Sequence, residues 1–245
     1  MARQMNDSHR RFLQIMMTNS IIDEQEAKAL YKYCCEIHKV QHFSDRLAEF
    51  IVTINSKLHP IFMEIRKGMS EVNGFQYYAL VNMVENDVTR MSSDYADNEL
   101  ELFKKTIELI VASDSGTASS TDILNSADTL TTKKLKKSET EQLLNRFVKD
   151  KWLDEKRGEY SLSTRSIIEL EPYIRLTYQD QVKVCHICHR IAFQSQICEN
   201  CGIKIHNPCV AKYFKGRTEP RCPQCDDFWP HEIPEILQLR SQPSQ

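Results

Sequence analysis

Seven of the nine cysteines in this 245-residue chain lie in its last quarter, and together with one histidine they form four regularly spaced pairs. The pairs are Cys185 with Cys188, Cys198 with Cys201, His206 with Cys209, and Cys222 with Cys225. A Cys-x-x-Cys turn directs two thiolates at one point about 2.3 Å from a zinc ion, and two such turns complete a tetrahedron. The spacing therefore favours metal binding, with disulfide formation as the competing use of paired cysteines.

The two uses of paired cysteines belong to different cellular compartments. The N-terminal stretch MARQMNDSHRR has neither the apolar region nor the small-residue cleavage site of a secretory signal, and no segment is long and apolar enough to cross a bilayer. Because disulfides are rare in reducing compartments, the pairs predict zinc binding, and no membrane is expected among the partners. A set of free buried thiols is the remaining alternative, and it does not account for the repeated spacing.

Eight ligands predict two closed four-coordinate sites and two zinc ions per chain. A closed site has no open position for water, so both ions are expected to be structural and to replace the apolar core that this short segment lacks. His186 and His189 are each adjacent to a cysteine ligand, so we expect them at the surface or hydrogen-bonded around the site. The adjacent Cys34 and Cys35 lack ligand spacing and are expected in a helical core or interface.

The composition is that of an ordinary soluble protein, with a formal net charge of −2 and 41% hydrophobic residues. Its length suits two or three small domains. There are only six glycines and no long low-complexity tract, which argues against a large disordered portion. No overall basic excess indicates a nucleic-acid-binding protein.

One local cluster of positive charge stands out in the stretch TTKKLKKSE, residues 131–139. It contains the candidate nucleic-acid contacts Lys133, Lys134, Lys136 and Lys137. They directly precede a predicted helix, a place that meets phosphates in helix-turn-helix folds. The favoured alternative is a solvated loop, because charge runs are commonly just exposed surface.

The first part of the chain has the pattern of three helices and a hairpin. Apolar residues at helical spacing predict helices around residues 12–16, over residues 23–38, and from Ser44 as N-cap to Pro60. Alternating apolar residues between 61 and 81 then predict two strands. This order of elements is typical of a winged helix.

The second part repeats the plan. Apolar spacing predicts a helix over residues 96–110, a short one over 121–130, and a third that begins with a capping box of Ser138 and Glu141. A hairpin with its turn at Arg157-Gly158 follows. A second winged helix is therefore expected.

A final helix, over residues 167–178, leads toward the cysteine-rich segment. Pro172 is expected to kink it or to end it early, because proline lacks a backbone donor.

The order of ligands, four cysteines, one histidine and three cysteines, resembles that of the RING and PHD-like zinc families, which interleave their sites. On that resemblance Cys185, Cys188, His206 and Cys209 hold zinc one, and Cys198, Cys201, Cys222 and Cys225 hold zinc two. A sequential arrangement, which joins the first two pairs, is left open by the spacing alone.

The whole chain resembles the non-SMC element one family, the variant-RING subunits of the structural maintenance of chromosomes five/six complex, and in particular its vertebrate members. The most specific stretches are CHICH, CENCGIKIHNPCVAKYF, EPRCPQC and FWPHEIP. The resemblance implies a nuclear, chromosome-associated protein of DNA repair. It also implies a MAGE-domain subunit as direct partner, a kleisin subunit reached through it, and RING-type ubiquitin ligase activity that the MAGE-domain partner stimulates. DNA is a further partner that the subcomplex could contact.

The resulting fold class is mostly α with small β-hairpins: tandem winged-helix domains followed by a C-terminal two-zinc variant RING domain. The expected division is winged-helix domain one at 1–90, winged-helix domain two at 91–180, the variant RING at 181–231 and a tail at 232–245.

A RING ligase performs no covalent step of its own, so no catalytic residue is expected. The resemblance places Ile187 and Pro223 where RINGs contact the ubiquitin-conjugating enzyme, and Phe214 could complete that groove. For each of the three, packing of the small zinc core is the alternative. Asp226 stands where active RINGs often carry an arginine, and a carboxylate cannot act as a cationic donor. Activity is therefore expected to be weak alone and dependent on the partner.

Two other functions remain. A PHD-like reader of histone tails shares the ligand order, but the tryptophan usual before the seventh ligand is absent from Thr218–Arg221, and the Cys-Pro-x-Cys ending favours a RING. A structural scaffold with little ligase activity is the other alternative, and Asp226 supports it.

Overall fold

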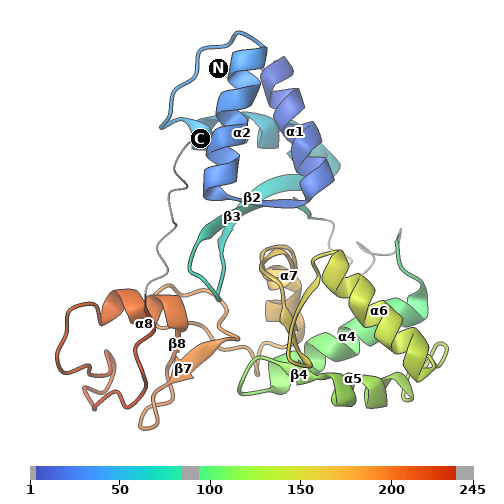
Figure 1. Cartoon of the computed structure of the whole chain (residues 1–245), viewed down its shortest axis with the longest axis vertical. Coiled ribbons are helices and arrows are strands. Elements are labelled where there is room, and N and C mark those ends of the chain that lie inside the picture. Colours follow the sequence, from blue (N-terminus) through green and yellow to red (C-terminus); the bar gives the residue numbers. More distant parts are fainter. Residues whose placement is uncertain (1–3, 84–93, 236–245) are drawn as a thin grey trace.

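The computed structural model describes residues 4–83 and 94–235. Two helical parts and a cysteine-rich part lie at the corners of a triangle, and the β2–β3 hairpin of the first part points toward the other two (Figure 1). No helix within the described residues has the length and apolar character needed to span a membrane.

The first part has the element order of a winged helix, as predicted. Its elements are α1 (Asp7–Asn19), β1 (Ile21–Asp23), α2 (Glu24–Ile37), α3 (Leu47–Leu58), the short 3-10 helix η1 (His59–Ile61), β2 (Met63–Met69) and β3 (Gln76–Asn82). The strands form an antiparallel sheet in the order β1-β3-β2. The helices close over a core that includes the fully buried Phe12, Met16 and Ile54. Cys34 and Cys35 lie in the same core, and burial raises the pKa of Cys34 to about 11. Both are therefore inert core residues, as the sequence indicates.

The start of α2 is a capping box. Asp23 accepts from the Glu26 N–H at 2.8 Å, and the Glu26 carboxylate accepts from the Asp23 N–H at 3.0 Å. The predicted cap of α3 is wrong: the helix begins after Arg46, with no side-chain cap, and not after Ser44. Burial of the apolar face of α3 fixes its start in place of a cap.

The second part also has the order of a winged helix, followed by one more helix. Its elements are α4 (Asp97–Ala112), β4 (Ala118–Ser119), α5 (Ser120–Ala127), α6 (Lys137–Lys149), β5 (Leu153–Lys156), β6 (Glu159–Leu162) and α7 (Thr164–Thr177). The sheet order is β4-β6-β5. Phe103 is central to the core, with its ring 5.0 Å from that of Phe147 and 6.0 Å from that of Trp152. Arg157 and Gly158 both have positive φ, as the predicted tight turn requires.

The capping box predicted for α6 is wrong by two positions. The helix begins after Lys136, whose N–H donates to the Glu139 carboxylate at 2.8 Å. Ser138 and Glu141 are exposed residues within the helix. Two carboxylates lie near this helix start, and the burial of Leu143, Leu144 and Phe147 selects the register.

The expectation that Pro172 ends the last helix early is also wrong. α7 continues through Pro172 to Thr177 because Tyr173 and Ile174, beyond the proline, are buried. The missing N–H of Pro172 leaves the Ile168 carbonyl without its helical donor. The Arg66 guanidinium of β2 donates to that carbonyl at 3.2 Å. The first winged helix therefore satisfies a backbone acceptor that the proline releases in the second part.

Both faces of β3 are covered. Tyr78 faces the core of the first winged helix, whereas Ala79 and Val81 pack with Ile168 of α7. On the neighbouring strand Gly68 lies so close to Ile168 that an added Cβ would be 2.3 Å from its Cγ1. The β1-β3-β2 sheet therefore packs on the core of the first winged helix with one face and contacts the second helical part with the other.

The cysteine-rich part contains β7 (Ser195–Ile197), β8 (Lys204–His206) and α8 (Asn207–Tyr213), with β7 and β8 antiparallel. Its small core holds Phe214, Trp229 and all of its cysteines except the exposed Cys201, and the rings of Phe214 and Trp229 are 5.5 Å apart. Ile191 and Phe193, from the start of this part, instead belong to the core of the second winged helix. The cysteine-rich part is therefore anchored in its neighbour and does not hang from a linker.

Candidate metal centre

The three Cys-x-x-Cys pairs adopt one common turn. The first cysteine of each pair accepts at its carbonyl from the N–H four residues on: His189 to Cys185 and Gly202 to Cys198 at 2.8 Å, and Asp226 to Cys222 at 3.0 Å. The donor residue has positive φ each time, 58° at His189, 73° at Gly202 and 60° at Asp226. Glycine and aspartate are among the residues that tolerate this conformation best. The turn gives Asp226 a structural reason to stand directly after the last ligand.

The fourth pair comes from a strand end and a helix start. His206 is the last residue of β8, and Cys209 lies in the first turn of α8. Pro208 occupies the first turn of the helix, where its missing N–H costs no hydrogen bond. The pair therefore needs no Cys-x-x-Cys turn to bring its two ligand atoms to one side.

The structure brings the eight ligands into two clusters, and the arrangement is interleaved. Cys185, Cys188, His206 and Cys209 form cluster one, and Cys198, Cys201, Cys222 and Cys225 form cluster two. In each cluster the ligand atoms lie within 4.8 Å of one another. The sequential arrangement, which the spacing leaves open, is therefore excluded.

The dimensions of cluster two fit a tetrahedral zinc ion. The Sγ atoms of Cys198 and Cys225 are 3.6 Å apart, as are those of Cys201 and Cys222. With zinc–sulfur bonds of about 2.3 Å, the edge of the tetrahedron is about 3.8 Å. All nine cysteines are free thiols, so no disulfide competes for these sulfurs. Each cluster can hold one zinc ion, as predicted.

The titration of the sulfurs points the same way. Hydrogen bonds from Cys188 and Cys209 lower the pKa of Cys185, whereas hydrogen bonds with Cys185 and Cys188, together with burial, raise the pKa of Cys209. Burial works against a charged Cys198, but N–H groups of Cys201 and Asn200 outweigh it and lower the pKa to about 7. Thiolates this close together cannot all be charged unless a cation neutralises them.

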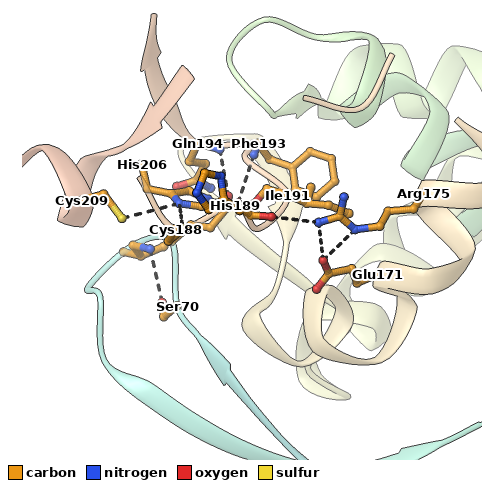
Figure 2. Close-up of polar contacts among 12 residues, drawn as sticks. Ser70, Glu171, Arg175, Cys188, His189, Ile191, Phe193, Gln194, His206 and Cys209 are labelled. Carbon is orange, nitrogen blue, oxygen red and sulfur yellow. Dashed lines mark hydrogen bonds and ion pairs between the residues drawn. The ribbon is translucent and has the colours of Figure 1, made fainter. Parts of the chain in front are cut away.

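His206 presents its two ring nitrogens to different partners (Figure 2). Nδ1 lies 3.3 Å from the Cys188 Sγ and 3.9 Å from the Cys209 Sγ. Nε2 lies 2.8 Å from the Ile191 carbonyl and 2.9 Å from the carboxylate of Glu71, a residue of the β2–β3 loop. Two acceptors therefore fix the proton on Nε2 and leave the lone pair of Nδ1 for a metal.

The sequence does not show how two residues around the clusters contribute: Glu71 carries no signal at all, and Trp229 belongs to the FWPHEIP stretch without its packing being apparent. Glu71 is an isolated carboxylate in a loop, 135 positions from His206. Trp229 is 1% exposed, packs on Phe214, and donates from Nε1 to Gln196 at 2.7 Å. The neighbouring histidines His186 and His189 lie outside both clusters, as expected.

The candidate contacts for a conjugating enzyme divide into two groups. Ile187 and Pro223 are partly exposed, each inside a Cys-x-x-Cys turn. Phe214 is 1% exposed and lies in the core of the zinc module. It therefore packs the zinc core, as the alternative to an enzyme contact states. The surface available to a partner therefore contains Ile187 and Pro223 without Phe214.

The four lysines near α6 are not buried in the core: Lys133, Lys134, Lys136 and Lys137 are all exposed. α6 and α8 lie on opposite sides of the molecule in Figure 1, so the structure does not bring these lysines to the zinc clusters. Their side chains are accessible to a partner other than one bound at the zinc module.

Two winged helices followed by an interleaved, two-site Cys/His module define a RING-like zinc protein of the winged-helix type. Models of two families match this chain: that of the Nse1 non-SMC component of the SMC5-6 complex, over residues 9–132 and 115–170, and that of a RING-like domain, over residues 185–225. The chain belongs to the Nse1 family of non-SMC components of the SMC5-6 complex.

Relatives and a solved structure agree with this assignment. The chain is 55% identical to the non-structural maintenance of chromosomes element 1 homolog of Xenopus laevis, over 99% of this chain and 90% of that protein. It is 50% identical to the human homolog, over 95% and 88%. A chain of the solved Nse1-Nse3-Nse4 complex matches with a TM-score of 0.88 and 55% identity, covering 94% of this chain and all of that one.

Proposed function

We propose that this protein is a RING-type ubiquitin ligase subunit of the SMC5-6 complex that acts on chromosomes in the nucleus, in DNA repair. The observation that carries the proposal is the interleaved zinc module with Ile187 and Pro223 left partly exposed on two of its turns. An apolar pair held on a rigid scaffold is what a weak, specific contact with another protein needs.

The module's part in the reaction is positioning. The amine of a substrate lysine attacks the thioester between ubiquitin and the conjugating enzyme; an amide bond forms, and the cysteine thiol of that enzyme is released. No side chain of this chain enters the bonds that change. Its contribution is to hold the conjugating enzyme and its ubiquitin in a reactive orientation, which lowers the entropic part of the barrier.

The partners proposed for this chain are a MAGE-domain subunit and a kleisin subunit. The similarity to a chain of the Nse1-Nse3-Nse4 complex supports this assembly. Asp226 supports a role for the partner in the reaction as well. Its φ of 60° suits aspartate at the turn after the last ligand, so the side chain at that position is an anion. The Arg221 guanidinium lies at the same turn, where it donates to the Asp226 carbonyl at 3.1 Å. The MAGE-domain subunit would then supply the missing orientation of ubiquitin.

The test is discharge of ubiquitin from a panel of loaded conjugating enzymes to free lysine, with and without the MAGE-domain subunit. Activity is expected with the partner and little without it. Ile187→Ala is expected to lower the rate about tenfold, equivalent to about 1.4 kcal/mol of binding free energy, with the zinc content unchanged. Val184→Ala is the matched control, because Val184 is an exposed apolar residue next to the same turn but outside it.

Three outcomes are informative. Absence of discharge from every enzyme in the panel, even with the partner, would replace the ligase with the scaffold. Discharge that Ile187→Ala leaves unchanged would keep the activity and move the contact surface elsewhere. Binding of histone-tail peptides by the zinc module without discharge would favour the PHD-like reader.

A contact with DNA inside the subcomplex rests on the exposed lysines at the start of α6. Replacing Lys133, Lys134, Lys136 and Lys137 with glutamine is expected to weaken binding to duplex DNA and to flatten the slope of log K against log salt by about 0.9 for each phosphate that is no longer neutralised. The control makes the same charge change at four exposed lysines of the first winged helix, Lys28, Lys32, Lys39 and Lys57. Equal slopes for the wild type and the α6 variant in fluorescence titrations would make these lysines solvated surface only.

A further inference from the structure

The tip of the β2–β3 hairpin buries a carboxylate. Glu71 is 4% exposed, although it lies in a loop of the first winged helix. The loop is closed by two backbone hydrogen bonds, from Ser70 to the Phe75 carbonyl at 3.0 Å and from Gly74 to the Ser70 carbonyl at 2.9 Å. Met69, at the end of β2, packs against the core of the zinc module. The tip is therefore a hydrogen-bonded loop that packs against the cysteine-rich part.

All three hydrogen bonds of the Glu71 carboxylate reach the zinc module. Oε1 lies 2.9 Å from Nε2 of His206 and accepts from the Phe193 N–H at 3.1 Å, and Oε2 accepts from the Gln194 N–H at 2.9 Å. An ionised carboxylate is the side chain that can accept several donors while offering none. A buried carboxylate without partners would be costly, so these contacts stabilise the docking of the hairpin.

The same contacts act on a metal ligand. A histidine that binds zinc through one nitrogen is oriented by the acceptor at the other, and such an acceptor also makes the ligating nitrogen more basic. Here the acceptors at Nε2 are Glu71 and the Ile191 carbonyl, and Ile191 is itself held in the core of the second winged helix. Each acceptor on His206 is thus fixed by a different winged helix.

We propose that Glu71 is a positioning residue for zinc one: the first winged helix supplies the carboxylate that orients His206, so zinc binding at cluster one and docking of the β2–β3 hairpin are coupled. By thermodynamic linkage the coupling is reciprocal. Docking of the hairpin strengthens zinc binding at cluster one, and zinc binding at cluster one strengthens docking of the hairpin. Cluster two consists of four cysteines and includes no histidine for such an acceptor to orient, so it is independent of the hairpin.

The test is Glu71→Gln in the full chain. Glutamine keeps the shape but turns one of the two acceptors into a donor, which opposes the N–H of Gln194 or the donors at the other oxygen. Release of zinc from cluster one to a chelating dye is expected to become about 10 to 100 times faster, as for other partners of ligating histidines. The rate of zinc release from cluster two is expected to stay within about twofold of the wild-type rate. Cobalt substitution separates the two, because a site of three cysteines and one histidine absorbs differently from a site of four cysteines.

A spectroscopic signature distinguishes positioning from mere packing. In the wild type the Nε2 proton of His206 is expected to give a slowly exchanging, downfield NMR signal, and in Glu71→Gln this signal should move or broaden. Glu219→Gln, at an exposed carboxylate in the loop before Cys222, is the control. Equal changes at both clusters, or none at cluster one, would overturn the proposal and leave Glu71 as a residue that only caps the 193–194 backbone.

The wild type offers a second test if Glu71→Gln does not fold. Limited chelation, followed by native mass spectrometry, gives species that have released zinc one. Hydrogen exchange in the loop 70–75 is expected to rise at least tenfold in these species, while exchange in α1 stays unchanged. Unchanged protection of the loop after release of zinc one would refute the coupling.

Discussion

Replacing Cys222 with serine is expected to remove one zinc ion and to unfold the zinc module, while the first winged helix stays folded. Cys222 is 3% exposed, its Sγ lies 3.6 Å from that of Cys201, and its N–H and carbonyl close the last turn with Asp227 and Asp226. The apolar core around it is small, with Phe214 and Trp229 as its largest members. Structural zinc supplies about 10–16 kcal/mol of apparent binding free energy in comparable small modules, far more than such a core provides.

The effect should be visible in metal content and in local stability. Native mass spectrometry is expected to show two zinc ions in the wild type and at most one in Cys222→Ser, with rapid proteolysis after residue 194. Cys35→Ala is the control, because Cys35 is equally buried but belongs to the core of the first winged helix. A variant that keeps two ions and a protected zinc module would contradict the two-cluster assignment.

The two winged helices should not respond alike. The core of the first contains no residue of the zinc module, whereas the core of the second includes Ile191 and Phe193. Unfolding of the module removes these two side chains from the second core, each worth about 1.5–3 kcal/mol when fully buried. We therefore expect a lower melting temperature for the second winged helix and an unchanged one for the first.

Local patterns in the sequence predict the elements well because they are set by local physics. The helices follow from apolar spacing, the second hairpin from Arg157-Gly158, and the zinc ligands from pairs that must point at one ion. The interleaving of the pairs follows from family resemblance, since spacing alone admits a sequential arrangement. Helix starts are less predictable: near α6 two carboxylates could serve as the capping partner, and burial of Leu143, Leu144 and Phe147 decides for Glu139.

Contacts between the three parts are beyond the reach of such patterns. The continuation of α7 through Pro172 depends on Arg66, more than 100 residues earlier, whose guanidinium takes the place of the missing N–H. Glu71 gives no signal either, because an exposed loop and a buried hairpin tip look the same in a sequence without its fold. The positions that tie the parts together are single residues whose partners lie far along the chain.

Gly116→Ala is expected to be the most destabilising addition of a single methyl group at a contact between the three parts. Gly116 has a φ of 69°, and a Cβ built on it would lie 2.6 Å from both the carbonyl carbon and the oxygen of Phe193. The backbone conformation alone costs a residue with a Cβ about 1–2 kcal/mol. The contact adds a further amount, about 1–3 kcal/mol, because a backbone carbonyl in a packed core cannot turn away as a side-chain end would.

Gly216 provides a matched control for the two contributions. Its φ is 75°, close to that of Gly116, but an added Cβ would have no neighbour within 4 Å. Gly216→Ala therefore carries the conformational cost alone, about 1–2 kcal/mol, whereas Gly116→Ala is expected to cost about 2–5 kcal/mol of stability. Urea unfolding of the zinc-loaded chain, followed by the fluorescence of Trp152 in the second winged helix, measures the effect of Gly116→Ala. The fluorescence of Trp229 does so for Gly216→Ala.

The site of the damage is as informative as its size. Phe193 fills the core of the second winged helix with its side chain and donates its N–H to Glu71 of the first. A shift of its backbone should therefore loosen both contacts, and hydrogen exchange should rise at residues 193–194 and in the hairpin loop 70–75. Equal destabilisation by Gly116→Ala and Gly216→Ala would show that the Phe193 backbone yields to the methyl group. Gly116 would then matter through its conformation alone, and the three parts would be held together less rigidly than their contacts imply.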